Sequence, residues 1–247
     1  MKLQGKVAVV TGGSSGIGEA AVKDFCEQGA KVVIADLNEQ GSELSSQLND
    51  QGYETVFQKT DVTSEEDIKN MVQTAVGTFG SLDILFANAG IGDATPAHEL
   101  SYEEWKKLMD VNMNGVFLSN KYAITQMLEQ ENGGAIVNNA SILGHVGQDS
   151  VTSYAAAKGG VVNLTRTLGV TYAKNNIRVN AVCPGYVETA ILENADDEMR
   201  QGLAGAHPIG RLGRPEEIAK AVSFLASDDA SFMVGANMLV DGGYTAQ

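Results

Sequence analysis

A tyrosine and a lysine in the middle of the chain have the spacing of a proton-transferring pair. Tyr154 and Lys158 lie four residues apart, and a helix places residues i and i+4 on one face. A phenol with a pKa of about 10 is a poor base at neutral pH, and a neighbouring cation lowers that pKa. Ser141 lies thirteen positions upstream of Tyr154. The pair by itself also fits an exposed helix surface, so its interpretation depends on the rest of the chain.

A glycine-rich segment near the start of the chain predicts a nucleotide site. Gly12, Gly16 and Gly18 follow an apolar, β-branched run at 6–11 and lead into a helical pattern over 16–28. A strand, a glycine turn and a helix are the context that a dinucleotide fingerprint requires. Glycines let the backbone approach a pyrophosphate, and the helix N-terminus offers unpaired N–H groups to it.

An acidic residue ends the second predicted strand. Asp36 follows the apolar run 31–35, at about the place where a carboxylate should accept hydrogen bonds from the hydroxyls of an adenosine ribose. A 2′-phosphate at that place would face a like charge, at a cost of several kcal/mol. The sequence therefore favours NAD over NADP.

Strands and helices alternate along the whole chain. Such alternation predicts an α/β fold, a single Rossmann-like domain over 1–247 with a doubly wound parallel sheet of about seven strands and helices on both faces. The segment 185–214 lacks strong periodicity, and we expect it to be a substrate lid. Strands are expected at 6–11, 31–35, 55–59, 82–87, 134–139, 177–183 and 236–240, and helices at 16–28, 39–50, 64–78, 101–130 (broken near Asp110), 152–174 and 215–226.

The residues with chemical potential all follow predicted strands. Open parallel sheets bind ligands outside the carboxyl ends of their strands, so these residues should meet at one edge. In strand order they are Gly12 to Gly18, Asp36, Asp61, Asn88 to Gly90, Ser141, and Pro184 with Gly185.

Composition excludes several other classes of protein. A net charge of −14 argues against nucleic-acid binding, which needs a positive surface. No basic-then-apolar leader and no apolar run of membrane-spanning length is present, so we expect a cytoplasmic protein that is not bound to membranes. Cys26 and Cys183 fall in a predicted helix and strand and should be reduced core residues. Three scattered histidines predict no metal site.

Taken together, these motifs resemble those of the short-chain dehydrogenase/reductase family. The resemblance covers essentially all 247 residues. Ala87 and Ala140 depart from the family pattern, because Asn and Ser are common there, but neither position carries a chemical role. The matching pieces are the glycine segment 11–18, Asp61-Val62, Asn88-Ala89-Gly90, Asn112, Ser141, Tyr154 with Lys158, Pro184-Gly185 and Val240-Asp241-Gly242-Gly243.

The resemblance implies hydride transfer between an alcohol and a nicotinamide, with a protein acid/base. Tyr154 would take the alcohol proton in oxidation and return it in reduction. Lys158 would lower the pKa of Tyr154 and hydrogen-bond the nicotinamide ribose. Ser141 would hold the reacting oxygen, and Asn112 would hold a water that connects Lys158 to solvent.

The resemblance also implies a set of cofactor contacts. Relatives that use NADP commonly carry Arg or Lys at one of four positions, and none occurs here at Ser14, Ser15, Leu37 or Asn38. NAD is therefore the expected cofactor. The implied contacts are Gly12, Ser14, Ser15, Gly16, Ile17, Gly18, Asp36, Leu37, Asp61, Val62, Asn88, Ala89, Gly90, Tyr154, Lys158, Pro184, Gly185, Val187 and Thr189.

Substrate identity is less defined. By resemblance, the pocket walls beside Ser141 and Tyr154 should include Leu143, His145, Tyr186, Ala190 and Leu192. This mainly apolar set favours a small neutral alcohol or ketone. A sugar or acetoin-type dehydrogenase stays open, and so does a 3-oxoacyl reductase, although the acidic stretch at 129–132 and the net charge disfavour an acidic carrier protein. A non-catalytic nucleotide-binding regulator is the alternative from another class.

Relatives in this family are usually tetramers, built through the helices that match 101–130 and 152–174 and through the C-terminal strand. We therefore expect a homotetramer. The ending from Asp241 to Gln247 is shared with some alcohol-reducing relatives that bind Mg²⁺ at the terminal carboxylate, so a structural Mg²⁺ is a further hypothesis.

Overall fold

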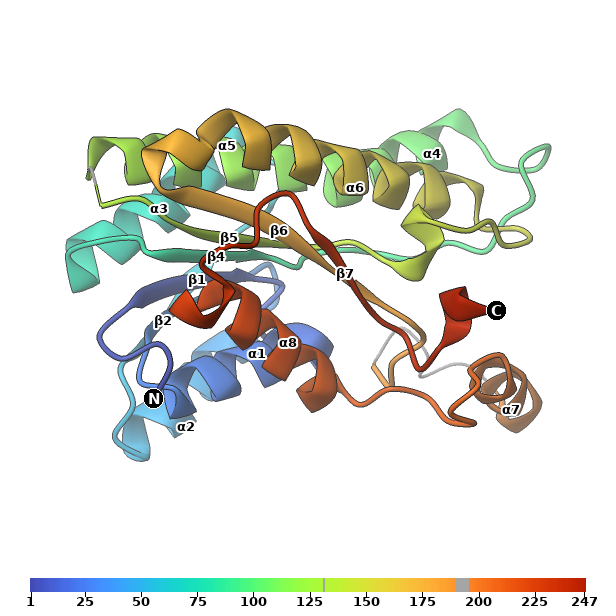
Figure 1. Ribbon diagram of the computed structural model, residues 1–247, viewed down its shortest axis with the longest axis horizontal. Helices are drawn as coiled ribbons and strands as arrows, with labels where there is room; N and C mark the ends of the chain where they lie inside the picture. The colour runs from blue at the N-terminus through green and yellow to red at the C-terminus, as the bar shows by residue number, and fades with distance from the viewer. Residues whose placement is uncertain (131, 190–195) are drawn as a thin grey trace.

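A sheet of seven parallel strands forms the centre of the molecule (Figure 1). The computed structural model describes residues 1–130, 132–189 and 196–247. The strand order is β3-β2-β1-β4-β5-β6-β7, so the winding direction reverses between β1 and β4, which is the switch point where such sheets bind ligands. The strands are Val7–Thr11 (β1), Lys31–Asp36 (β2), Thr55–Lys59 (β3), Ile84–Ala87 (β4), Gly134–Asn139 (β5), Ile177–Pro184 (β6) and Asn237–Val240 (β7).

Helices cover both faces of this sheet, as the alternation of elements predicted. In Figure 1 one layer holds α3, α4, α5 and α6, the other holds α1, α2 and α8, and α7 lies beyond the end of the sheet near the C-terminus. The helices are Gly16–Glu27 (α1), Gln40–Asp50 (α2), Glu65–Phe79 (α3), Tyr102–Met109 (α4), Gly115–Glu129 (α5), Thr152–Tyr172 (α6), Asp197–Gly205 (α7) and Pro215–Ala226 (α8).

Burial of both sheet faces explains the unbroken apolar runs. All five residues of β1 are buried. Val7 and Val9 belong to the core under α3, α5 and α6, whereas Ala8 and Val10 belong to the core over α1, α2 and α8. Successive strand residues point to opposite faces, so a strand covered on both sides must be apolar at every position. The predicted Rossmann-like fold is confirmed.

Two of the helices begin at a capping serine. The Ser64 hydroxyl accepts a hydrogen bond from Asp67 N at 3.2 Å, which caps α3. Ser101 and Glu104 form a reciprocal capping box at α4. These side chains satisfy backbone N–H groups that the first helical turn leaves unpaired.

Two features of the helices differ from a regular pattern. The expected break near Asp110 is a π-helical turn over Asp110–Asn114 between α4 and α5. The segment 185–214 contains α7, which the sequence did not predict. None of the α7 residues is buried, so the helix has no apolar stripe to reveal it. Its start is marked only by Asp196, whose side chain accepts a hydrogen bond from Met199 N at 2.8 Å.

The length and apolar content of the helices show whether any of them could cross a membrane. Within the described ranges, none of the helices combines the length and the apolar content needed to cross a bilayer. The 21 residues of α6 include exposed polar side chains such as Thr152. Its buried positions, among them Val161 and Val162, pack into the core against the sheet.

Candidate active site

A cleft of about 330 Å³ opens at the carboxyl ends of β1, β2, β4 and β5. The predicted convergence of motif residues on one edge is therefore observed. Fourteen residues of the expected cofactor set line this cleft: Gly12, Ser15, Gly16, Ile17, Asp36, Leu37, Asp61, Val62, Asn88, Ala89, Gly90, Tyr154, Lys158 and Thr189.

The floor of the cleft is a turn that admits glycine alone at two positions. Gly12 has a φ of +62°, and a Cβ added there would lie 2.9 Å from the Cα of Ala89. A Cβ at Gly18 would lie 1.9 Å from the carbonyl oxygen of Gly12. Both distances are too short for real contacts, so bare backbone is required for the turn to close under the helix N-terminus of α1.

A network of amides fixes this turn to the neighbouring strands. Asn88 Nδ2 donates to the carbonyl oxygens of Thr11 and Gly12, each at 3.0 Å. Asn139 Nδ2 donates to Asn88 Oδ1 at 2.9 Å. Asn139 Oδ1 is buried without a hydrogen-bond partner and Asn139 lines the cleft. An unpartnered buried acceptor is costly, so this residue is suited to a donor supplied by a ligand or a bound water.

The carboxylate of Asp36 lies at one end of the cleft. Its Oδ2 accepts a hydrogen bond from Ser14 N at 3.0 Å, and its Oδ1 accepts one from Asn38 N at 2.9 Å. The exposed side chain of Leu37 lies next to it in the lining. Backbone donors thus hold the carboxylate in place as an acceptor for hydroxyl groups and a barrier to anions.

Lys158 is buried at the other end of the cleft. Its Nζ donates to the carbonyl oxygen of Asn139 at 2.7 Å, and a Cβ at Gly90 would lie 3.7 Å from Nζ. Burial lowers the pKa of the Lys158 ammonium to about 8, because a charged amine loses hydration inside the protein. Lys158 therefore loses its positive charge as the pH rises through about 8.

Burial sets the direction of the Tyr154 pKa, and the lowering effect expected of Lys158 stays a prediction. Burial raises the pKa of the phenol, a hydrogen bond with Ser141 opposes that rise, and the charge of Asp93 adds to it. Lys158 Nζ lies 5.5 Å from the centre of the Tyr154 ring. Because burial disfavours the charged phenolate, Tyr154 is a neutral phenol near neutral pH and can donate a proton.

Asn112 makes two hydrogen bonds to the backbone of the loop after β4. It is fully buried in the π-helical turn. Its Oδ1 accepts from Ile91 N at 2.8 Å and its Nδ2 donates to Ile91 O at 2.7 Å. The side chain thus fastens the loop after β4 beside Gly90, close to Lys158. Its expected role in holding a water remains a prediction.

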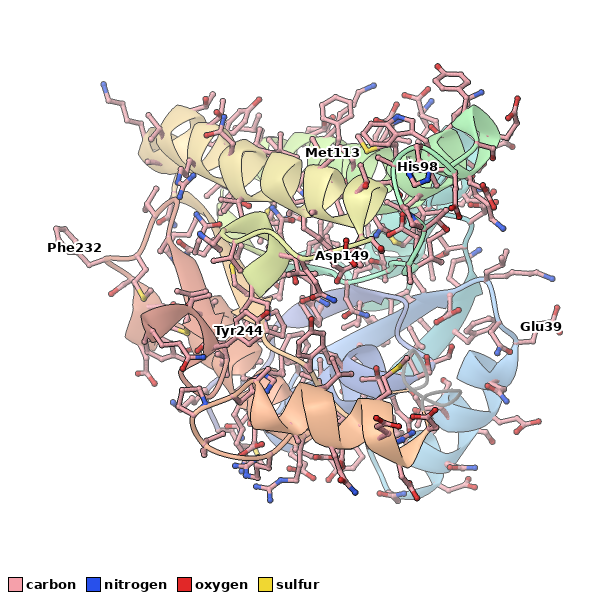
Figure 2. All side chains as sticks on the ribbon, turned by 90° about the vertical axis from the view of Figure 1, so that its right-hand side faces the viewer. Glu39, His98, Met113, Asp149, Phe232 and Tyr244 are labelled. Atoms are coloured by element: carbon pink, nitrogen blue, oxygen red, sulfur yellow. The ribbon has the colours of Figure 1, made fainter. Side chains whose placement is uncertain are left out.

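A largely apolar wall lies next to Tyr154. Buried Leu143 and Val151 form a cluster with Tyr154, Tyr186 and Tyr244. Tyr244 comes from the C-terminal turn, and Figure 2 shows it on the face between α6 and α7. The rings of Tyr186 and Tyr244 meet nearly at right angles with centres 5.9 Å apart. Tyr244 was not predicted, because a tyrosine in a short tail carries no local signal.

Several predicted residues lie outside the cleft lining. Ser14, Gly18, Asn112 and Ser141 act through the bonds and close contacts given above. Gly185 and Tyr186 line a separate cavity of about 200 Å³ with His207 and Asp241. Other predicted residues away from the cleft lining are Pro184 at the end of β6, Val187, Leu143 and the exposed His145, while Ala190 and Leu192 fall outside the described residues.

The cleft also contains residues that the sequence analysis missed. Asn139 ends β5 and could have been recognised by the position of its strand end. Ile91 and Val111 are apolar neighbours of recognised motifs and have no chemical signal of their own. The missed lining residues are Thr60, Ile91, Val111 and Asn139.

Neither cysteine is in a disulfide, and the described side chains form no cluster suited to a metal ion. Cys26 and Cys183 are both free and buried, as predicted. In the parts of the chain that the structure describes, no three His, Cys, Asp or Glu side chains are grouped to hold a metal ion. The hypothesis of a C-terminal Mg²⁺ therefore gains no support from these side chains.

Comparisons with known proteins point to one family. A family model described as enoyl-(acyl carrier protein) reductase matches residues 12–245. The chain is 49% identical over 242 residues to cis-4-hydroxycyclohexanecarboxylate dehydrogenase of Sinomonas cyclohexanicum, covering 98% of this chain and 97% of the relative. It is 42% identical over 248 residues to cyclohexanol dehydrogenase of an Acinetobacter species, covering 100% and 97%.

Another curated dehydrogenase and a solved structure also match the chain. A 2,5-dichloro-2,5-cyclohexadiene-1,4-diol dehydrogenase of Sphingobium indicum is 42% identical over 248 residues, covering 99% of this chain and 98% of the relative. A crystal structure of a short-chain type dehydrogenase/reductase from Mycobacterium marinum superimposes with a TM-score of 0.96 at 34% identity, covering 100% of this chain and 98% of the other. The chain belongs to the short-chain dehydrogenase/reductase family and is an oxidoreductase that acts on CH–OH groups.

Proposed function

We propose that this enzyme is an NAD-dependent dehydrogenase of small cyclic secondary alcohols. The observation that carries the proposal is one continuous cleft with the Asp36 carboxylate at one end and Tyr154 with Lys158 at the other. That arrangement suits an extended dinucleotide whose adenosine lies by Asp36 and whose reactive ring lies by Tyr154.

The residues present fit such a dinucleotide. Gly12 and Gly18 leave no room for a Cβ where the backbone closes the turn, and Asn139 Oδ1 is an orphaned buried acceptor that lines the cleft. Asp36 and Leu37 favour NAD, because a 2′-phosphate would face the carboxylate and Leu37 supplies no cation to pair with it. When bound, NAD supplies the hydride acceptor.

The chain's own residues would handle the proton. In oxidation, the Tyr154 phenolate would accept the proton of the substrate hydroxyl as the carbinol carbon is oxidised to C=O, with the bound dinucleotide as the hydride acceptor. Tyr154 then releases that proton to solvent, so reduction runs the same steps in reverse. The Ser141 hydroxyl, which hydrogen-bonds Tyr154, would also hold the substrate oxygen. Lys158 would hold the nicotinamide ribose.

The substrate class is supported by the walls and by the relatives. The three relatives are named for substrates with a six-membered carbon ring. The wall beside Tyr154 is formed by Leu143, Val151, Tyr186 and Tyr244, which offers apolar and aromatic contacts to such a ring. A ring alcohol is therefore favoured over the sugar, acetoin and acyl-carrier alternatives.

The assembly and location are proposals of the same kind. Phe232, at the edge of the view in Figure 2, is fully exposed, and Leu239 of the edge strand β7 is 43% exposed. An edge strand with apolar residues invites pairing with another copy. We propose a cytoplasmic homotetramer in which β7, α4, α5 and α6 face other subunits.

A substrate panel tests the proposal. Initial rates would be measured with cyclohexanol, cis-4-hydroxycyclohexanecarboxylate, a linear secondary alcohol, a sugar alcohol, acetoin and a 3-hydroxyacyl thioester, each with NAD and with NADP. We expect the ring alcohols with NAD to give the highest kcat/KM. A preference for the thioester or for NADP would contradict the proposal.

A further inference from the structure

The loop after β4 brings a carboxylate beside Tyr154 that no role described above uses. Ser153, fully buried in the first turn of α6, donates its hydroxyl hydrogen bond to Asp93 Oδ2. A parallel backbone bridge also joins Thr95 to Val151. The segment 91–95 is thus fastened twice to the residues that directly precede Tyr154.

The second oxygen of this carboxylate has an unusual environment. Asp93 Oδ1 is shielded from solvent and has no hydrogen-bond partner. A buried carboxylate oxygen without a donor loses hydration and regains nothing for it. Its charge is therefore poorly screened, and it acts on nearby groups over a longer range than a solvated carboxylate does.

Tyr154 is one group that experiences this charge. Burial is the main reason that the pKa of the phenol is raised, and the negative charge of Asp93 raises it further, against the lowering effect of the Ser141 hydrogen bond. The other titratable groups on the elements around Tyr154 are Lys158 on α6, His145 after β5, Cys183 on β6, Tyr186 after β6 and Tyr244 in the C-terminal turn.

We propose that Asp93 is a positioning residue for the hydride-transfer reaction, one that holds the start of α6 through Ser153 and whose negative charge opposes ionisation of the Tyr154 hydroxyl. This inference rests on the proposed role of Tyr154 as the acid/base. A protonated Tyr154 donates its proton in ketone reduction, whereas alcohol oxidation needs the phenolate. Asp93 would thus move the pH range of alcohol oxidation to higher pH.

Asp93→Asn is the decisive variant, because it removes the charge and retains an oxygen that can accept from Ser153. The pH profile of kcat/KM for alcohol oxidation should show a limb that rises as Tyr154 loses its proton. We expect Asp93→Asn to shift that limb to lower pH by about half a unit to one unit, which raises kcat/KM at pH 7 roughly three- to tenfold. Asp93→Glu keeps the negative charge, so the limb should lie at the same pH as in the wild type.

Matched variants separate charge from structure. Asp149→Asn removes the exposed carboxylate labelled in Figure 2 and should leave the limb in place. Ser153→Ala keeps the charge and removes the hydrogen bond, so it should lower the melting temperature without moving the limb to lower pH. If Asp93→Asn proves unstable, Asp93→Ser removes the same charge and should give the same direction of shift.

The outcomes also distinguish this inference from the proposed function. Suppose that Tyr154→Phe abolishes the limb, whereas Asp93→Asn and Asp93→Ser leave it at the wild-type pH. That result would overturn the role of Asp93 and leave the role of Tyr154 intact. Full activity in Tyr154→Phe would overturn the acid/base assignment itself. An equal shift in Asp149→Asn would show that the effect comes from net charge, and it would also overturn the role of Asp93.

Discussion

The two halves of the ligand-binding edge are built in different ways. The half formed by β1, β2 and β4 is held by hydrogen bonds between motif residues, such as Asn88 to Thr11 and Gly12 at 3.0 Å. The half beside Tyr154 is held by side-chain packing between distant segments, such as Tyr186 and Tyr244 with ring centres 5.9 Å apart. In the first half, Gly12 and Gly18 leave no room for a larger side chain. In the second half, replacing one side chain would change the shape of the wall.

This difference matches what each half must recognise. A dinucleotide is the same in many enzymes, so a fixed set of backbone and amide groups serves it well. A substrate differs between enzymes, and an apolar wall can be altered one residue at a time with an effect on binding of a few kcal/mol. We infer that cofactor binding depends on exact backbone geometry and that substrate choice depends on the Tyr186 and Tyr244 wall.

The largest expected effect is on the chemical step at the junction of the two halves. Tyr154→Phe removes the proton-transferring hydroxyl and should lower kcat by about 10² to 10⁴, because general acid–base catalysis supplies that much. NADH binding, followed by its fluorescence, should stay close to wild type. Tyr172→Phe, on the same helix, is the control and should leave kcat unchanged. Loss of NADH binding in Tyr154→Phe would place the tyrosine in the cofactor half instead.

The next effect tests the rigidity of the cofactor half. Gly18→Ala places a Cβ 1.9 Å from the Gly12 carbonyl oxygen, so the turn must open and NADH affinity should fall about 100-fold or more, as measured by fluorescence titration. Gly77→Ala in α3 meets no atom within 4 Å. That control should keep NADH affinity and raise the unfolding free energy by about 0.5–1 kcal/mol. Equal NADH affinity in both variants would mean that the turn tolerates movement.

A smaller effect is expected at the adenosine end of the cleft. Asp36→Ser combined with Leu37→Arg replaces a carboxylate with a cation that can pair with a 2′-phosphate. The ratio of kcat/KM for NADP to that for NAD should rise roughly 100-fold, in steady-state assays with each cofactor. Asp50→Ser removes an exposed carboxylate at the end of α2 and should leave the ratio unchanged. An unchanged ratio in the double variant would show that Asp36 does not face the ribose.

The smallest effect is expected in the substrate half. Tyr244→Ala removes one ring from the apolar wall and should raise KM for a ring alcohol about tenfold. KM for NAD should stay within about twofold, because Tyr244 does not line the cofactor cleft. Steady-state kinetics with each substrate varied in turn measures both values. A larger change for NAD than for the alcohol would reverse the assignment of the two halves.

Sequence reasoning was accurate where neighbouring residues carry the structure. Gly12, Asp36 and Asn88 are recognisable because each directly follows an apolar run, and β-strand burial places all three at one edge. The break near Asp110 was also predictable, and it is a π-helical turn. These are local patterns whose spatial consequence follows from the topology of a parallel sheet.

The sequence was less informative where long-range packing decides. The exposed helix α7 has no apolar stripe, and Tyr244 reaches the wall only because the C-terminal turn folds back over the end of β6. The rise in the pKa of Tyr154 on burial could not be predicted, since the spacing to Lys158 says nothing of how deeply both groups are buried. Burial is a property of the whole fold.

Direct transfer of hydrogen is the most decisive measurement. The enzyme would be given NAD and a ring alcohol deuterated at the carbinol carbon, and the reduced cofactor would be examined by mass spectrometry. We expect one deuterium in each NADH formed by the wild type, and about 10² to 10⁴ times less labelled NADH from Tyr154→Phe in the same time at equal enzyme concentration. Unlabelled NADH from the wild type, or normal labelling by the variant, would contradict the account.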